Sequence, residues 1–481
     1  MRFAGFIGPG YTLQSVVADC QRCVNWYPEV NELSTQADGE VAALIQVPGY
    51  KLLTSIGDGP IRGMWFTSSG RLAVVSGNQV YRVAIVNGAW TGGLAGTIGT
   101  STGPVSMADN GTQLILVDGA AGYIISLANG VMTKITNEFF VPAATVVFQD
   151  GYFIAGSTNM NQFAISKLYD GFTWDGLDFG VAEGSPDAVV AIVSNMRQVW
   201  LLGQETIEVW WNTGNADFPF QRIDGAFIEY GCAAPSTAQK FNNSVVWLGG
   251  GAKANGIVWI AQGFTPKRIS NHAVEFAIQQ VADLSTTTAW TYQENGHTFY
   301  CLNLPGATTT WVYDSATEQW SERVFLNRGL EERHRAEHYA MAYNVHVIGD
   351  YQNGNIYQMD MDYATFDGSP VVRIRRAPHL SANMNRVFYK HFQLAGSMGQ
   401  GLDGAPVVGQ DPIAELRYSD DFGFTWSPYL QRSLGPIGAF RTRALWHKLG
   451  QSRNRVYELR ITDPIKFTAT GAELDLQPGN S

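Results

Sequence analysis

The sequence predicts an all-β protein: a β-propeller of six or seven blades with an N-terminal arm and a C-terminal β-sandwich or barrel-like unit. Three observations predict this fold class. Aromatic residues make up 12% and charged residues only 15% of the 481 residues, and 52 glycines occur without a three-residue period, which is typical of turn-rich β structure. Strand pairs recur regularly along the chain, and the charge balance changes sign near residue 360.

The regular strand pairs predict the propeller. Each pair combines an apolar strand rich in β-branched or aromatic residues, a turn built on Gly, Asn or Asp, and a second strand ending near an aromatic residue. The pairs begin at residues 71, 112, 151, 198, 244, 297 and 345, so successive starts lie 39 to 53 residues apart. A period in the forties is what four-stranded propeller blades require. The alternative is a β-sandwich whose hairpins happen to be evenly spaced.

Composition predicts the domain boundaries. Residues 1–50, punctuated by Gly and Pro, form the expected arm; residues 51–360 form the propeller, and residues 361–481 form a C-terminal domain of short strands. The last segment carries 14 Lys and Arg against 11 Asp and Glu, whereas the whole chain has a net charge of −10, so the body before it is acidic. An acidic body repels phosphates, which argues against tight nonspecific binding of nucleic acid.

The N-terminus predicts a protein made in a cytoplasm, and the cysteines predict buried thiols. The opening "MRFAGFIGPGYTLQ" has early Gly and Pro and no long apolar run, so we expect neither a secretory signal nor a membrane span. Cys20 and Cys23 form a C-x-x-C pair that could bind zinc or perform redox chemistry. The second pair that a zinc site needs is missing, because Cys232 and Cys301 stand alone, so buried thiols are the expected state.

The stretch "HRAEH", from His334 to His338, satisfies the H-x-x-E-H pattern of zinc peptidases. That chemistry needs a helix and a third ligand, whereas this stretch lies in a charged connection between two predicted hairpins. We therefore expect a solvated loop and no zinc. "GGGAKANG" (249–256) lacks the order of a phosphate-binding loop, and "MDMDYATFDG" (359–368) misses the spacing of a calcium loop, so we expect a turn, a polar linker and no cofactor.

The stretch "SDDFGFTWS" (419–427) resembles the Asp-box of sialidases and other β-propeller proteins. Its residues in register are Ser419, Asp421, Gly423, Thr425 and Trp426. An Asp carboxylate accepts backbone N–H groups across a tight turn, Gly permits a positive φ, and Trp fills a core at the strand end. A shortened echo, "YDGFTWDG", occupies 169–176. A sialidase would need an arginine triad converging in the propeller, whereas Arg373, Arg375 and Arg376 form a run outside it, so we interpret the box as a structural turn.

Several segments in order along nearly the whole chain resemble the tail hub of short-tailed phages, a family also called packaged-DNA stabilisation protein, tail accessory factor or nozzle. They include "DCQRCVNWYPEV" followed by "VPGY", "RIDGAFIEYGCAAPSTAQKFNNSVVWLGG", "PKRISNHAVEFAI" and "LRYSDDFGFTWS". The resemblance implies a noncatalytic virion protein: a homohexameric ring below the portal and adaptor rings that continues the DNA channel and retains packaged DNA. It also implies docking of tail fibres, tailspikes, or a plug or needle. A propeller that acts on or binds carbohydrate is the alternative.

A basic cluster follows the otherwise acidic chain in "FRTRALWHKLGQSRNRVYELR". Its members are Arg441, Arg443, Lys448, Arg453, Arg455 and Arg460. Few aromatic residues are interleaved for base stacking, and the body's negative field opposes capture of DNA. We therefore expect this candidate assembly patch to pair with carboxylates of a neighbouring subunit or of the adaptor ring, because Arg makes bidentate contacts.

Overall fold

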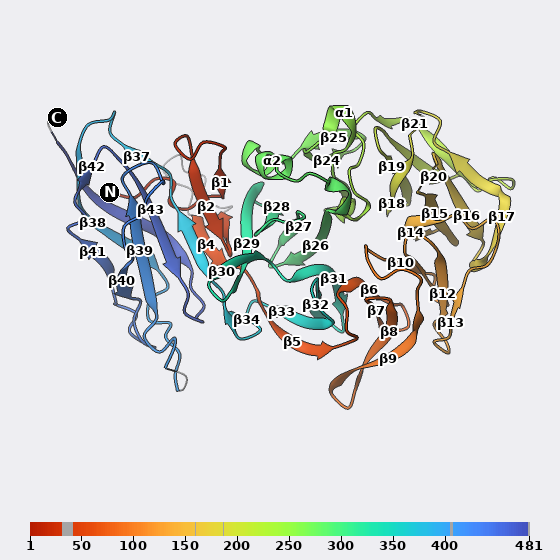
Figure 1. Ribbon diagram of the computed structural model, residues 1–481, viewed down its shortest axis with the longest axis horizontal. Helices are drawn as coiled ribbons and strands as arrows, with labels where there is room; N and C mark the ends of the chain where they lie inside the picture. The colour runs from red at the N-terminus through yellow and green to blue at the C-terminus, as the bar shows by residue number, and fades with distance from the viewer. Residues whose placement is uncertain (31–41, 159, 186, 405–406, 480–481) are drawn as a thin grey trace.

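The computed structural model describes residues 1–30, 42–158, 160–185, 187–404 and 407–479. Figure 1 shows an elongated all-β molecule with a ring of sheets at one end and a β-sandwich at the other. The predicted fold class, a propeller followed by a sandwich, is confirmed.

Five sheets of four antiparallel strands follow one another around the ring (Figure 1). Their strands are β6 (Ile61–Phe66), β7 (Leu72–Ser76), β8 (Gln79–Val86) and β9 (Ala89–Thr97); β10 (Ser106–Asp109), β11 (Gln113–Val117), β12 (Gly122–Ser126) and β13 (Met132–Lys134); β14 (Ala143–Gln149), β15 (Tyr152–Ser157), β16 (Gln162–Lys167) and β17 (Asp170–Val181); β18 (Val189–Asn195), β19 (Gln198–Gly203), β20 (Ile207–Asn212) and β21 (Phe220–Ile228); and β22 (Gln239–Phe241), β23 (Ser244–Leu248), β24 (Val258–Gln262) and β25 (Thr265–Arg268).

Two larger sheets complete the ring. One contains β26 (Thr288–Glu294), β27 (His297–Asn303), β28 (Thr310–Asp314) and β29 (Gln319–Asn327), with β30 (Leu330–Arg333) beside β29. The other contains β31 (Ala336–Ala342), β32 (Val345–Asp350), β33 (Asn355–Asp360), β5 (Gly49–Ser55), β34 (Thr365–Phe366) and β35 (Ser369–Pro370). Because β5 pairs antiparallel with β33, an early strand joins the two ends of the ring.

The hairpin turns are built on Asn and Gly residues, as the sequence predicts. Asn87 and Gly88 both have positive φ between β8 and β9, and Asn295 and Gly296 repeat this between β26 and β27. Two consecutive left-handed residues match the right-handed twist of the flanking strands, and Asn–Gly adopts them at little cost. The helical segments are short: α1 (Gly251–Ala254), α2 (His272–Gln279) and the 3-10 turns Pro235–Thr237 and Leu284–Thr286.

The sandwich packs two sheets around one apolar core. One sheet contains β36 (Arg373–Arg376), β43 (Asn454–Ile461), β39 (Ile413–Ser419) and β40 (Leu430–Ser433), with β37 (Leu380–Ser381) beside β43. The other contains β3 (Trp26–Val30), β4 (Ala42–Gln46), β44 (Ala469–Pro478), β38 (Val387–Gly396) and β41 (Ala444–His447), with β42 (Gln451–Ser452) beside β38. Phe392, Trp446 and Leu459 are fully buried between them.

The N-terminal segment joins the two domains instead of lying apart from them. After β1 (Tyr11–Thr12), strand β2 (Cys20–Val24) pairs on one side with β29 of the propeller and on the other with β36 of the sandwich. A single sheet therefore runs from β26 through β29, β2, β36, β43 and β39 to β40. Hydrogen bonds of one continuous sheet hold the ring and the sandwich together.

Candidate functional site: the arginine-rich junction

The Asp-box forms the turn that connects β39 to β40. The carboxylate of Asp421 accepts hydrogen bonds from the backbone N–H of Thr425 (2.8 Å), from the Thr425 hydroxyl (2.6 Å) and from the Ser419 hydroxyl (2.7 Å). These bonds, led by that of the Thr425 hydroxyl, lower the pKa of Asp421 to about 2. Gly423 has a φ of 100°, in the region that favours glycine. The hydrogen bonds to the Asp carboxylate and the positive φ of the Gly that the Asp-box predicts are therefore present.

Trp426 differs from its expected role, because it does not enter an apolar core. Its ring lies 4.7 Å from the guanidinium carbons of both Arg376 and Arg417, and it remains partly exposed. The indole N–H donates to the Gly423 carbonyl at 3.2 Å. The turn thus folds an aromatic ring over charged side chains, which the sequence pattern alone does not specify.

Under Trp426, a row of charges crosses the sheet. Glu458 on β43 lies opposite Arg376 on β36 and Arg417 on β39, and its side chain is 1% exposed. Arg376 Nε donates to its carboxylate at 2.8 Å, Arg417 Nε at 2.7 Å and the Tyr429 hydroxyl at 3.0 Å. Burial acts to raise the pKa of Glu458, but the two guanidiniums outweigh it and hold the pKa below its ordinary value.

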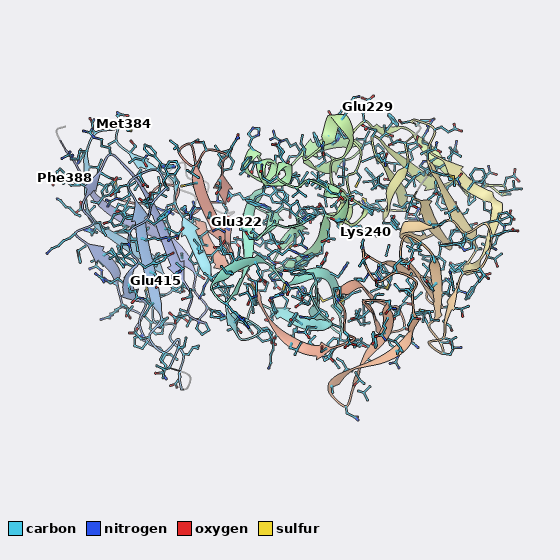
Figure 2. All side chains as sticks on the ribbon, in the orientation of Figure 1. Glu229, Lys240, Glu322, Met384, Phe388 and Glu415 are labelled. Atoms are coloured by element: carbon cyan, nitrogen blue, oxygen red, sulfur yellow. The ribbon has the colours of Figure 1, made fainter. Side chains whose placement is uncertain are left out.

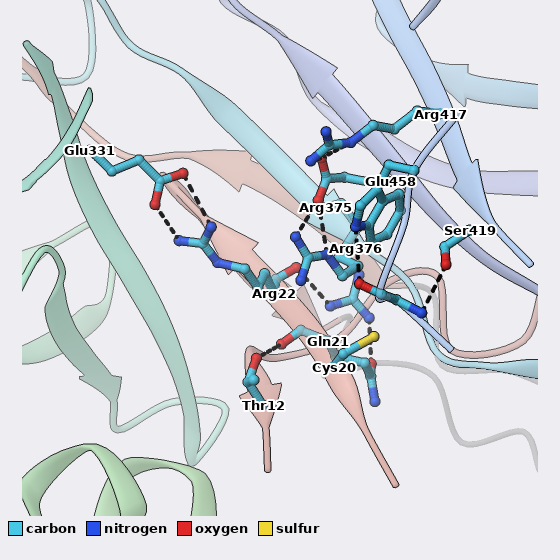
Figure 3. A network of polar contacts seen from close by, with 12 residues as sticks. Thr12, Cys20, Gln21, Arg22, Glu331, Arg375, Arg376, Arg417, Ser419 and Glu458 are labelled. Carbon is cyan, nitrogen blue, oxygen red and sulfur yellow. Dashed lines mark hydrogen bonds and ion pairs between the residues drawn. The ribbon is translucent and has the colours of Figure 1, made fainter. Parts of the chain in front are cut away.

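The same row continues to the propeller through Arg22. Arg22 lies opposite Arg376 across β2 and β36, and its guanidinium binds Glu322 on β29 (2.8 Å) and Glu331 on β30 (3.0 Å). Figure 3 shows Arg22 reaching toward Glu331 while Arg376 and Arg417 surround Glu458. Paired charges therefore reinforce the junction along the strand-to-strand direction.

Arg375, on the same strand as Arg376 but facing the other way, fixes the start of the chain. It is fully buried, and its N–H groups donate to the carbonyls of Gly5, Phe6, Pro9 and Arg22 and to the Gln21 side chain, at 2.6 to 3.2 Å. Without a carboxylate among these partners, burial lowers the pKa of Arg375 to about 10. Arg373 is also fully buried and donates to the Gln46 side chain at 2.8 Å. These arginines bind backbone and amide oxygens and are closed to substrate.

The candidate assembly patch divides into two groups, and its expected role is wrong for one of them. Arg455 is 1% exposed, pairs with Asp420 (Nε–Oδ1, 2.6 Å) and lies 4.0 Å from the Tyr418 ring. Arg460 pairs with Glu415 at 2.7 Å and lies 3.9 Å from the Tyr429 ring. Both find their carboxylates within their own chain, because Arg460 lies opposite Glu415 across β43 and β39, and Asp420 follows Ser419, which lies opposite the neighbour of Arg455. The exposed members are Arg441, Arg443, Lys448 and Arg453.

The "HRAEH" stretch is not the expected solvated loop. It begins between β30 and β31 and continues into β31, and His334 is fully buried among the rings of Tyr50, Trp290 and Phe366. Burial lowers the pKa of His334 well below its ordinary value. Glu337 pairs with Arg333 at 3.0 Å. Within the described ranges, no group of three or more His, Cys, Asp or Glu side chains has the arrangement of a metal site.

The four cysteines are free and buried, as expected. Burial raises the pKa of Cys23 and of Cys301 to about 12 and that of Cys232 to about 11, so these thiols stay protonated. Cys20 and Cys23, three residues apart on β2, point to opposite faces. In the part of the chain that the structure describes, no helix is both long and apolar enough to span a membrane.

A propeller and a sandwich joined by one sheet define a two-domain all-β protein. The chain matches the family described as "Bacteriophage P22 Gp10, beta-propeller" over residues 22–364 and "Bacteriophage P22 Gp10, beta-sandwich" over residues 373–477. It belongs to this family of short-tailed phage tail proteins, the packaged-DNA stabilisation family.

Solved propellers are similar at low identity. The WD40 β-propeller domain of Doa1 is 13% identical, covering 65% of this chain and 96% of that chain with a TM-score of 0.42. A selenomethionine-substituted virginiamycin B lyase from Staphylococcus aureus is 10% identical, covering 65% and 98% with a TM-score of 0.45. No curated protein matches the chain.

Proposed function

We propose that this phage tail structural protein is the tail hub or nozzle: a homohexameric ring below the portal and adaptor rings that continues the DNA channel and retains packaged DNA. It has no catalytic activity, and it binds tail fibres, tailspikes, or a plug or needle. DNA passes through the channel without sequence-specific contacts, because the acidic propeller body repels phosphates. The protein is made in the host cytoplasm and resides in the virion tail.

The continuous sheet through β29, β2 and β36 is the observation that carries this proposal. A ring that holds back packaged DNA must transmit force between the part that contacts its neighbours and the part that faces the channel. Backbone pairing across the domain boundary, with the Arg22 and Arg376 ion pairs beside it, supports a two-domain body that moves as one. A flexible linker would leave the domains free to move separately.

The carbohydrate alternative is not favoured. The complete Asp-box lies in the sandwich and forms a turn, and Arg373 and Arg375 are buried without access to a ligand. The propeller family model and the sandwich family model both describe the phage protein.

Native mass spectrometry of the purified chain, alone and with portal and adaptor, tests the proposal. We expect hexamers, or a complex with the adaptor ring, that electron microscopy shows as a ring with a central channel. A chain that stays monomeric with both partners, or that hydrolyses a sialoside, would contradict it.

Reversing charge in the exposed part of the candidate assembly patch, Arg441→Glu with Arg443→Glu, should weaken assembly while the chain stays folded.

A further inference from the structure

A groove crosses the outer face of the sandwich sheet at the end of the molecule away from the propeller. It has a volume of about 710 Å³. Figure 2 shows Phe388 at this end. The lining residues are Phe388, Tyr389, Lys390, His447, Lys448, Gly450, Gln451 and Gln477.

Two irregularities of the backbone turn lysines into this groove. The pairing of β38 with β44 shifts register between Tyr389 and His391, so Lys390 is the extra residue of a bulge, and its side chain is exposed. Bulges re-aim side chains in this way. Lys448 follows β41 with a φ of 57°, which is uncommon for a residue other than Gly, Asn or Asp. Its backbone N–H donates to the Lys390 carbonyl at 2.9 Å, which fixes the two lysines side by side.

The backbone in the groove is already paired. Tyr389 N–H donates to the Gly450 carbonyl at 2.9 Å, and Leu449 N–H donates to the Tyr389 carbonyl at 3.1 Å. An additional strand therefore cannot pair with β38 here. A ligand must be recognised by side chains: the two ammonium groups, the His447 ring, the Phe388 ring and the amides of Gln451 and Gln477.

Charge and apolar surface coincide in the groove. Phe388 is 42% exposed, so part of its ring is open to a ligand. The ammonium groups of Lys390 and Lys448 make no ion pair with any residue that the structure describes, and no carboxylate is among the lining residues. By contrast, Arg455 and Arg460 of the same domain are paired within the chain.

We propose that this groove binds an extended acidic segment of a partner polypeptide. The two lysines bind carboxylates of the segment, Phe388 contacts one of its apolar side chains, and the two glutamine amides bind its backbone. The inference rests on the proposed role as a docking protein and names the chemistry of one partner.

A polypeptide fits better than DNA because acidic residues border the groove on the same face. Asp475 and the exposed Glu473 precede Gln477 on β44 at alternating positions, and so share its face. They would repel the phosphates of a duplex that extended past the lysines. The same carboxylates would repel an acidic peptide that reached them, so the bound segment is short and stays between Lys390, Lys448 and Phe388.

The test measures fluorescence anisotropy of a labelled peptide of alternating Glu and Leu with the 481-residue chain at low ionic strength. We expect saturable binding that weakens at least tenfold in Lys390→Glu with Lys448→Glu, and severalfold in Phe388→Ala. A peptide of alternating Gln and Leu should bind at least tenfold more weakly than the acidic peptide. The control variant Lys134→Glu changes an exposed lysine on β13 and should bind like the wild type.

Thermal melting checks that each variant is folded, and Lys390→Gln with Lys448→Gln replaces the double variant if that one is not. No binding by the wild type, or equal binding by the neutralised variant, overturns the proposal. Duplex DNA that binds with the same dependence on the lysines would instead make the groove a nucleic acid site. Because peptide binding does not require assembly, its failure would leave the ring proposal standing, and a monomeric wild type that binds the peptide would refute only the ring.

Discussion

Two short segments of this protein have similar sequences, DGFTW (170–174) in the propeller and DFGFTW (421–426) in the sandwich, but they place their tryptophans in opposite environments. In the propeller, the Thr173 hydroxyl donates to Asp170 at 2.6 Å, and Trp174 Nε1 donates to the Gly171 carbonyl at 2.8 Å. In the sandwich, the same types of bond connect Thr425 to Asp421 and Trp426 to Gly423. The two side-chain bonds are therefore common to both segments, although Asp170 to Trp174 lie in strand β17, whereas Asp421 to Trp426 lie in the turn between β39 and β40.

The surroundings of the two indoles differ. Trp174 is 2% exposed and packs in the apolar cluster with Ile124 and Phe153. Trp426 covers Arg376 and Arg417 at the junction of the domains. The shared residues therefore give the same two side-chain bonds on different backbones, since Gly423 has a φ of 100° and Gly171 has no positive φ. The neighbouring strands decide whether the aromatic residue fills a core or shields an ion pair.

Trp174→Ala should have the largest effect. Removing a fully buried indole leaves a cavity between two sheets of the ring and should cost about 3–5 kcal/mol of unfolding free energy. Chemical denaturation monitored by circular dichroism measures this loss. A loss no greater than that of Trp426→Ala would show that the two environments are energetically alike.

Glu458→Gln should have the second largest effect and lower the free energy of unfolding by about 3 kcal/mol. The carboxylate neutralises two guanidiniums in a nearly dry site, so an amide leaves both charges uncompensated. Denaturant unfolding measures the effect, and Asp475→Asn, in the other sheet and partly exposed, is the matched control. If both changes cost the same small amount, the row under Trp426 does not stabilise the junction.

The sequence predicts the fold because hairpins are local: their turn residues and alternating strands are readable within one segment. The junction could not be predicted in the same way. The run "RIRR" shows that Arg375 and Arg376 face opposite sides of a strand, but not that the partner strands are β2 and β43. The sequence places Arg455 in a patch that pairs with another subunit, because charged residues are usually exposed, whereas Asp420 and Tyr418 of its own chain allow its burial.

Trp426→Ala should cost about 1–2 kcal/mol, less than Trp174→Ala, because a partly exposed indole contributes mainly cation–π contacts. Denaturant unfolding gives the value, and Trp426→Phe should retain part of it because a smaller ring still lies over the guanidiniums. A cost near that of Trp174→Ala would mean that the apolar area of Trp426 outweighs its contacts with the arginines.

The smallest expected effect is the pH dependence of stability that the carboxyl groups of Asp170 and Asp421 contribute. Burial acts to raise the pKa of Asp170, but hydrogen bonds from Thr173 and from the Phe172 N–H outweigh it and leave the pKa below its ordinary value. Asp421 has its pKa lowered to about 2. A carboxyl group whose pKa is lower in the folded state stabilises fully above its ordinary pKa near 4 and loses this contribution as the pH falls through 2.

We therefore expect Asp421→Asn to be less stable than the wild type at neutral pH, and the difference to shrink between pH 4 and pH 2. Denaturant midpoints of both proteins at pH 7, 4 and 2.5 measure it. Asp403→Asn, which changes an exposed carboxyl group away from the turn, is the control and should show no such convergence. A gap between wild type and Asp421→Asn that stays constant down to pH 2.5 would mean that the hydrogen bonds of the turn do not favour the ionised carboxylate. The Asp-box would then owe its stability to Gly423 and to the ring of Trp426 over the arginines.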